Sequence, residues 1–209
     1  MTAHDLIDPL PRPRIGVVPT IIPGCVELRP TVTRDTRGFF AKIFHTPLWQ
    51  DLGLQTEFAE EYVTYSLPWT LRGLHFQTPP MAHDKVVLCL HGNAFDVAVD
   101  LRKGSPAYGQ HIAVNLSSMQ SNALYVPAGV AHGFCVTGTE VLLYYKLTTV
   151  YSPAHDVGIR WDSAGILWPL TDPIISDRGC GSRNLNYLLL TAQRLAATRT
   201  QLVVFQKAA

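Results

Sequence analysis

Short strand-like segments separated by turn residues fill the middle of this chain, and they constrain its fold more than any other feature. Between residues 58 and 114 the segments end at stretches rich in Pro, Gly, Asn and Ser, located at 67–68, 78–80, 91–93 and 103–106. The pattern continues through 123–126, 133–136 and 141–151, where β-branched and aromatic residues are frequent. Many short strands at near-regular spacing predict an all-β barrel or sandwich.

The chain has 209 residues, 47% of them hydrophobic, which is enough for one domain with a large core and terminal arms. Five prolines within the first 23 residues favour an extended N-terminal arm over residues 1–22, which can also pair with a neighbouring subunit. Residues 23–183 are expected to form the barrel, and residues 184–209 a C-terminal extension. In that extension Asn184 is expected to cap a helix over about 185–198, which a short apolar strand follows.

Local signals also predict the elements between the arm and the repeated strands. A short strand is expected at residues 25–30, followed by a turn at 33–38 and a second strand at 39–44. Residues 47–52 are expected to form a single helical turn, with Pro47 tolerated near its start.

Charge and cysteine content narrow the class of partner. Seventeen Lys and Arg against sixteen Asp and Glu give a net charge of +1 with no block of like charges, so neither nucleic acid nor a membrane surface is an expected partner. The four cysteines are scattered, without Cys-x-x-Cys spacing, and are expected to be reduced thiols of a cytoplasmic protein. The longest apolar run falls far short of the ~20 residues of a membrane span.

Polar side chains in the segment 71–77 are the first candidates for chemistry. The strand period of two sends His75 and Gln77 to one side of a sheet, where Lys85 on the next strand can join them. A base beside an ammonium can remove the proton next to a carbonyl and hold the resulting oxyanion. The alternative for His75 alone is a structural histidine, but Lys85 opens an apolar run and is costly to bury without a partner or a task.

Two further groups of residues extend this candidate site. A Pro-x-Gly turn at 127–129 places His132 at the start of a strand, although a β-turn with a surface histidine explains the same residues. In the segment 141–151 the period of two sends Tyr145 and Tyr151 to one face. Half-buried tyrosines are also usual in barrels, so a structural role is the alternative for each.

The sequence disfavours metal binding, nucleotide hydrolysis and Ser-based acyl transfer. The order His75-Phe76-Gln77 stands where a metal site would need His-x-His, and no glutamate follows at a useful spacing, so we expect no metal. The chain has no phosphate-cradling glycine loop and no Gly-x-Ser-x-Gly turn.

Seven ordered motifs between about residues 25 and 176 resemble the dTDP-4-dehydrorhamnose 3,5-epimerase family. They are DTRGFF at 35–40, LRGLHFQ at 71–77, PP at 79–80 followed by Lys85, FDVAVDLR at 95–102, PAGVAHGF at 127–134, YK at 145–146 with YSP at 151–153, and GIRWD at 158–162. The resemblance implies a cupin-type double-stranded β-helix, or jelly-roll barrel, without metal or cofactor and usually homodimeric. It also implies a nucleotide-activated 4-keto-6-deoxy sugar as substrate, epimerised at C3, C5 or both through an enolate.

The resemblance also implies roles for individual residues. His75 matches the general base, Lys85 the cation at the enolate oxygen, and Tyr145 the acid that returns a proton on the opposite face. The positions expected to contact the sugar, the phosphates or the nucleotide are Arg37, Phe39, Glu60, Arg72, Gln77, His132 and Tyr151.

This chain departs from the family pattern at several positions. Gly179 aligns with the aspartate that normally orients the histidine, and Asp177 is the nearest substitute. Substitutions on the nucleotide side of the pocket leave the choice among dTDP, GDP and CMP open; they are Lys42 for Glu, Glu60 for Gln, Tyr62 for Asn and Leu88 for Arg. Three alternatives also stay open, namely a catalytically inactive sugar-nucleotide-binding protein, a 4-ketosugar ketoisomerase and a metal-dependent cupin.

Overall fold

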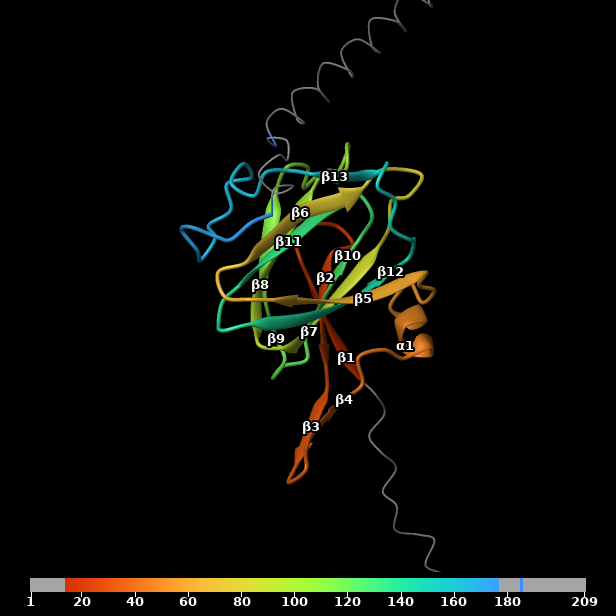
Figure 1. Ribbon diagram of the computed structural model, residues 1–209. Coiled ribbons are helices and arrows are strands. Elements are labelled where there is room, and N and C mark those ends of the chain that lie inside the picture. Colours follow the sequence, from red (N-terminus) through yellow and green to blue (C-terminus); the bar gives the residue numbers. More distant parts are fainter. Residues whose placement is uncertain (1–13, 177–184, 186–209) are drawn as a thin grey trace, which may run out of the picture.

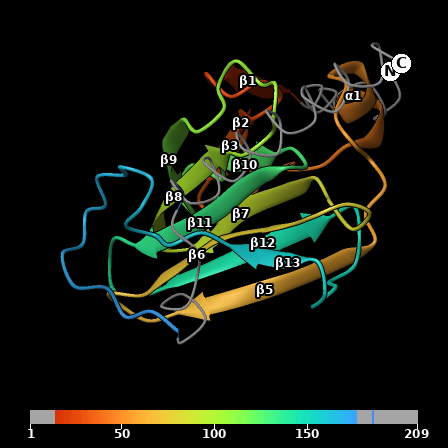
Figure 2. The same ribbon diagram turned by 90° about the horizontal axis from the view of Figure 1, so that it is seen from above.

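The computed structural model describes residues 14–176 and Leu185, which include two large antiparallel sheets, a separate two-stranded hairpin and one short helix. The six-stranded sheet contains, in spatial order, β1 (Ile15–Pro19), β2 (Val26–Pro30), β10 (Ala123–Val126), β7 (Lys85–His91), β12 (Val141–Leu147) and β5 (Glu60–Ser66). The five-stranded sheet contains β13 (Asp156–Gly158), β6 (Leu71–Gln77), β11 (Val130–Val136), β8 (Asn93–Asp100) and β9 (His111–Ser117). The two sheets lie face to face (Figures 1 and 2), which confirms the predicted all-β jelly roll.

Side chains from both sheets form the core between them. Val87 and Leu143 of the six-stranded sheet pack in one cluster with Ala98 and Phe134 of the five-stranded sheet. Burial follows the period of two most clearly in β12, where every second residue is buried. The strand ends at Leu147, so the predicted run to residue 151 is too long.

The single described helix, α1 (Thr46–Asp51), confirms the predicted helical turn and carries a buried aromatic anchor. Pro47 lies in its first turn, where the missing amide hydrogen costs nothing. Trp49 is fully buried, and its ring packs edge-on against Phe44 and Phe58 at centroid distances of 5.0 and 6.1 Å. The helix therefore packs against the face of the six-stranded sheet that points away from the core, where Trp49 clusters with Leu88 and Tyr125.

Part of the extended arm expected over residues 1–22 is instead a strand paired within the chain. Residues 15–19 form β1, which pairs along its whole length with β2, and β2 matches the predicted strand at 25–30. Residues 1–13 lie outside the described residues, as does the C-terminal extension apart from Leu185. Leu185 packs with Leu74 and Ile159.

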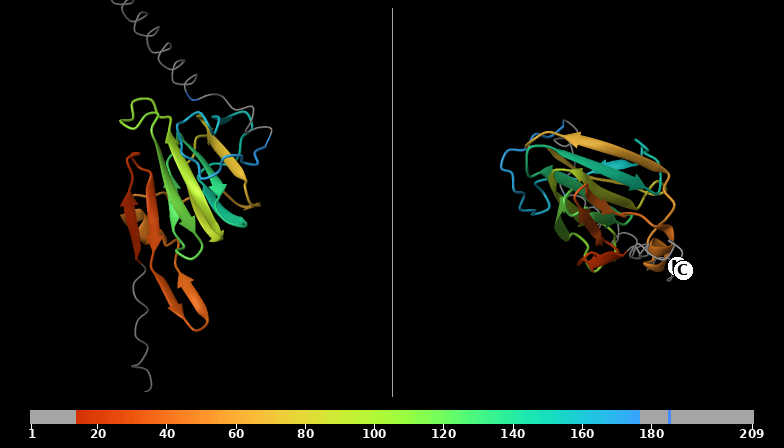
Figure 3. Two further views of the ribbon diagram at one scale, coloured as in Figure 1. Left: turned by 90° about the vertical axis from the view of Figure 1, so that its left-hand side faces the viewer. Right: turned by 90° about the horizontal axis from the view of Figure 1, so that it is seen from below.

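A hairpin of β3 (Val32–Asp35) and β4 (Gly38–Ala41) projects away from both sheets (Figure 1; Figure 3, left). The chain turns only at residues 36–37, so the predicted turn at 33–38 is largely strand and the predicted strand at 39–44 is shorter. Phe40 is 62% exposed at the hairpin. Phe39, the neighbouring aromatic residue of the hairpin, is 49% exposed, so neither ring belongs to the core of this chain.

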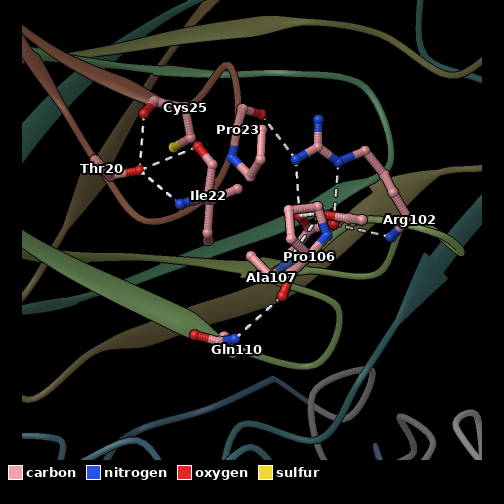
Figure 4. A network of polar contacts seen from close by, with 10 residues as sticks. Thr20, Ile22, Pro23, Cys25, Arg102, Pro106, Ala107 and Gln110 are labelled. Atoms are coloured by element: carbon pink, nitrogen blue, oxygen red, sulfur yellow. Dashed lines mark hydrogen bonds and ion pairs between the residues drawn. The ribbon is translucent and has the colours of Figure 1, made fainter.

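A polar network joins the loop before β2 to the loop between β8 and β9 (Figure 4). The Arg102 guanidinium donates to the Asp100 carboxylate at 2.7 Å and to the Pro23 carbonyl oxygen at 2.8 Å. In the same loop the Thr20 hydroxyl donates to the Cys25 carbonyl oxygen at 2.8 Å. Because Asp100 is fully buried, its paired charge and hydrogen bonds offset the cost of its desolvation.

Three cysteines lie within the described residues, namely Cys25, Cys89 and Cys135, and all three are free and buried. Burial raises the pKa of the Cys25 thiol to about 12, so it remains a neutral thiol. The prediction of reduced thiols is confirmed for these three, and Cys180 lies outside the described residues. No helix in the described part of the chain has the length and hydrophobicity of a membrane span.

Candidate active site

A cavity of about 490 Å³ opens between the two sheets and collects five of the predicted site residues. They are Arg72, His75, Lys85, His132 and Tyr145. A neighbouring cavity of about 290 Å³ is lined by three more, Glu60, Gln77 and Tyr151. Tyr62, His75 and Lys85 line both cavities, so these three residues mark the place where the two adjoin.

His75 lies in β6, where this strand pairs closely with β11 of the five-stranded sheet. It lies opposite His132 of β11, and the pairing of the two strands shifts register between His132 and Phe134. At this irregularity a side chain on Gly73 would meet the Gly133 Cα at 2.5 Å, so the close approach of β6 to β11 requires glycine. His75 and Gln77 line the same cavity, as the strand period predicted.

Lys85 faces His75 from the other sheet. It begins β7 in the six-stranded sheet, so the prediction that it lies on a strand adjacent to His75 is wrong. The two groups still line the same cavities, because the sheets face each other. Burial lowers the pKa of Lys85 to about 8, while Asp96 and Asp156 limit the fall. The ammonium therefore remains mostly protonated at neutral pH.

His132 is held by a buried carboxylate that the sequence analysis did not assign to the site. Its Nε2 lies 2.9 Å from each carboxylate oxygen of Asp96, and both residues are almost completely buried. Burial raises the pKa of Asp96, and His132 and then Lys85 oppose that rise. An aspartate within the apolar run of β8 was the available signal, since a buried acid needs a partner.

Tyr145 lies in β12, facing the cavity from the six-stranded sheet. Its ring stacks on Tyr62 at a centroid distance of 4.7 Å and meets the edge of His132 at 6.1 Å. The pKa of Tyr145 is raised well above 10, first by burial and then by Asp96 and Tyr62. Its phenol is therefore protonated near neutral pH and is a potential proton donor.

Polar residues around the smaller cavity include two that the sequence analysis missed. The Gln77 amide nitrogen lies 3.1 Å from Nδ1 of His83, and burial followed by the charge of Lys85 lowers the pKa of His83 to about 4. Asp156 lines the same cavity from β13. His83 and Asp156 gave no sequence signal, because each stands in a turn-like stretch without strand periodicity.

The larger cavity is also bordered by Arg72, whose Nε donates to the Ser66 hydroxyl at 2.9 Å. Two predicted substrate contacts, Arg37 and Phe39, line neither cavity of this chain. Both lie on the projecting hairpin, where Arg37 pairs with Asp35 at 2.6 Å. Their substrate-binding roles remain predictions. Gly179 and its possible substitute Asp177 lie outside the described residues.

Within residues 14–176 and Leu185, no three His, Cys, Asp or Glu side chains are arranged to hold a metal ion. Asp96 and His132, the buried carboxylate and imidazole beside the cavity, are hydrogen-bonded to each other.

Taken together, the jelly-roll barrel and the imidazole, ammonium and phenol that line its cavity define a cupin-class protein equipped for proton transfer. The sequence profile described as dTDP-4-dehydrorhamnose 3,5-epimerase matches residues 19–186. The chain belongs to this family.

Three relatives match this chain in sequence over most of their own length, and two of them are solved structures. The dTDP-4-dehydrorhamnose 3,5-epimerase of Shigella flexneri is 40% identical over 167 residues, covering 78% of this chain and 92% of the relative. The crystal structure of the Bacillus anthracis enzyme of that name, with TDP and PPi bound, is 36% identical with a TM-score of 0.80, covering 82% of this chain and all of that one. A Legionella pneumophila epimerase in complex with dTDP-4-keto-L-rhamnose is 33% identical with a TM-score of 0.79, covering 83% and 94% of the two chains.

Proposed function

We propose that this protein is an isomerase that epimerises a nucleotide-linked 4-keto-6-deoxy sugar at C3, C5 or both, in deoxysugar biosynthesis. The observation that carries the proposal is that His75 and Tyr145 project into one cavity from opposite sheets, with Lys85 lining it as well. Relatives that share this fold are named for the same reaction. A planar ketose ring between the sheets would then present one face to each residue.

The reaction follows from what each group can do to a proton. The neutral imidazole of His75 takes the proton from the carbon next to the ketone, and the electron pair of the broken C–H bond moves to the carbonyl oxygen. The Lys85 ammonium stabilises the negative charge that develops on this oxygen. Tyr145 then donates its phenolic proton to the carbon from the opposite face, and the carbonyl is restored with inverted configuration.

The remaining residues bind and orient the substrate. Arg72 offers a guanidinium suited to a phosphate at the edge of the larger cavity. Glu60, Gln77 and Tyr151 line the smaller cavity, where a nucleotide or the far side of the sugar would fit. His132, fixed by Asp96, offers a polar edge toward the sugar without changing position.

Solvent exchange distinguishes this function from its alternatives. Incubation with dTDP-4-keto-6-deoxyglucose in heavy water is expected to place deuterium at C3 or C5 and to yield the epimer, both visible by proton NMR. Saturable binding without exchange would favour the binding-protein alternative, and a 3-keto product would favour the ketoisomerase. The same experiment with GDP- and CMP-linked 4-ketosugars identifies the nucleotide.

The lowered pKa of Lys85 predicts an alkaline limit to activity. Only the protonated amine stabilises the enolate, and burial lowers its pKa to about 8. Activity is therefore expected to fall as the pH rises through about 8, measured as kcat over pH 6 to about 10. The residual activity of a Lys85→Met variant should lack this fall. An unchanged alkaline limb in the variant would assign the limb to another group.

We also propose a homodimer in which the hairpin of one protomer reaches the cavity of its partner. This arrangement would give Arg37 and Phe39, which are exposed and outside the cavities of their own chain, a place to bind substrate. Random mixing of two inactive variants, Arg37→Ala and His75→Ala, should restore about a quarter of wild-type activity, because half of the dimers are mixed and each has one intact site. No recovery in dimers shown to exchange subunits would place Arg37 elsewhere.

The free thiols of the three described cysteines support a proposed cytoplasmic location. Fractionation of producing cells would test it, and recovery in the periplasm would contradict it.

A further inference from the structure

Tyr62 lines both cavities, and its ring stacks on Tyr145, the proposed acid. It lies in β5, the edge strand of the six-stranded sheet, directly opposite Tyr145 in the pairing of β5 with β12. The two rings stack at 4.7 Å with only 21° between their planes. Cross-strand aromatic pairs of this kind restrict each other's rotamers.

The ring of Tyr145 is held from two directions. Tyr62 covers its face, and the ring of His132 approaches at 74° from the other sheet with a centroid distance of 6.1 Å. His132 is itself fixed by two contacts of 2.9 Å to Asp96. Of the two supports, only Tyr62 is partly open to solvent, at 39% exposed, and it comes from an edge strand. It is therefore the support that substitution can remove without opening the core.

We infer that Tyr62 is a positioning residue that fixes the Tyr145 ring, and so decides how often the enolate is protonated on the face opposite His75. This inference rests on the proposed function. The enolate has two proton sources. Return of the proton from the His75 imidazolium regenerates the substrate with solvent exchange, whereas donation from the Tyr145 hydroxyl forms the new C–H bond of the epimer.

Both routes balance and start from the same intermediate. In the second route the phenol O–H bond breaks, the enolate electron pair forms the C–H bond, and the tyrosinate regains a proton from solvent while the His75 imidazolium loses one. The ratio of exchange to epimerisation therefore reports the placement of the acid alone. A misplaced acid slows the second route, because proton transfer depends steeply on distance and alignment.

The test compares Tyr62→Ala with Tyr62→Phe in heavy water, using the 4-ketosugar nucleotide that the wild-type protein epimerises. Tyr62→Ala is expected to raise the ratio of deuterium in recovered substrate to epimer formed by about tenfold. Tyr62→Phe retains the ring and should keep the ratio within about twofold of wild type. Tyr65→Ala is the matched control, because Tyr65 lies on the same strand, is 58% exposed and lines neither cavity.

The outcomes separate positioning from stability and from the function itself. An unchanged ratio in a Tyr62→Ala variant that still exchanges at close to the wild-type rate would overturn the inference. A ratio that rises as much in Tyr62→Phe would also overturn it, since the hydroxyl would then be responsible. A general loss of structure would lower both routes together and leave the ratio unmoved. Absence of exchange by the wild-type protein would overturn the proposed function, and this inference with it.

Discussion

Replacement of His75 by alanine is expected to lower solvent deuterium incorporation into a 4-ketosugar nucleotide by about 10²–10⁴-fold, the usual contribution of a positioned general base. Neither of the other two described histidines near the cavities is well suited to act as the general base. His132 is already hydrogen-bonded to Asp96. Burial, followed by the charge of Lys85, lowers the pKa of His83 to about 4, which makes it a weak base. Exchange and epimerisation should fall together, because both require the enolate.

The control for this prediction is His91→Ala. His91 ends β7 outside both cavities, with an exposed ring 3.6 Å from Glu140. This variant should retain wild-type exchange, measured by NMR under the same conditions. Exchange that persists in His75→Ala at the wild-type rate would remove His75 from the mechanism and, with it, the assignment of the two faces.

Replacement of Tyr145 by phenylalanine is expected to separate the two halves of the reaction. The variant retains the ring that stacks on Tyr62 and meets His132 but lacks the acidic O–H. Epimer formation should fall by about 10²–10³-fold, whereas deuterium should still enter recovered substrate through His75. The raised pKa of Tyr145 supports this role, because a protonated phenol is required and burial maintains it.

Tyr144→Phe is the matched control for this second prediction. Tyr144 is the preceding residue of β12, its side chain points to the other side of the strand, and its hydroxyl donates to Glu61 at 2.7 Å. Its loss should leave both exchange and epimerisation close to wild type. If Tyr145→Phe lowered exchange and epimerisation equally, Tyr145 would belong to enolate formation rather than to proton return.

For the site, the sequence predicted which residues line the cavity better than it predicted which sheet each residue lies in. Ordered motifs indicated His75, Lys85, His132 and Tyr145, and all four line one cavity. Local periodicity correctly placed His75 and Gln77 on one side of β6, because that relation depends only on the alternation of side chains along a strand. It misplaced Lys85, because the number of residues between two strands does not say whether they share a sheet.

The residues that were missed depend on contacts between distant parts of the chain. Asp96 joins the site through His132, 36 positions further along the chain. Tyr62 was noted only as a departure from the family pattern, and its stack with Tyr145 depends on the pairing of β5 with β12. Neither relation leaves a local pattern, since each depends on which strands become neighbours.

By itself, the sequence determined the all-β class and the short helix, and it predicted candidate site residues that line one cavity, because propensity, alternation and turn residues act over a few positions. Only the tertiary structure decided that Lys85 faces His75 across the barrel, that Asp96 contacts His132, and that the Tyr62 ring stacks on Tyr145. Strand neighbours and register are selected by burial of the whole core between the two sheets, and that free energy belongs to no single segment.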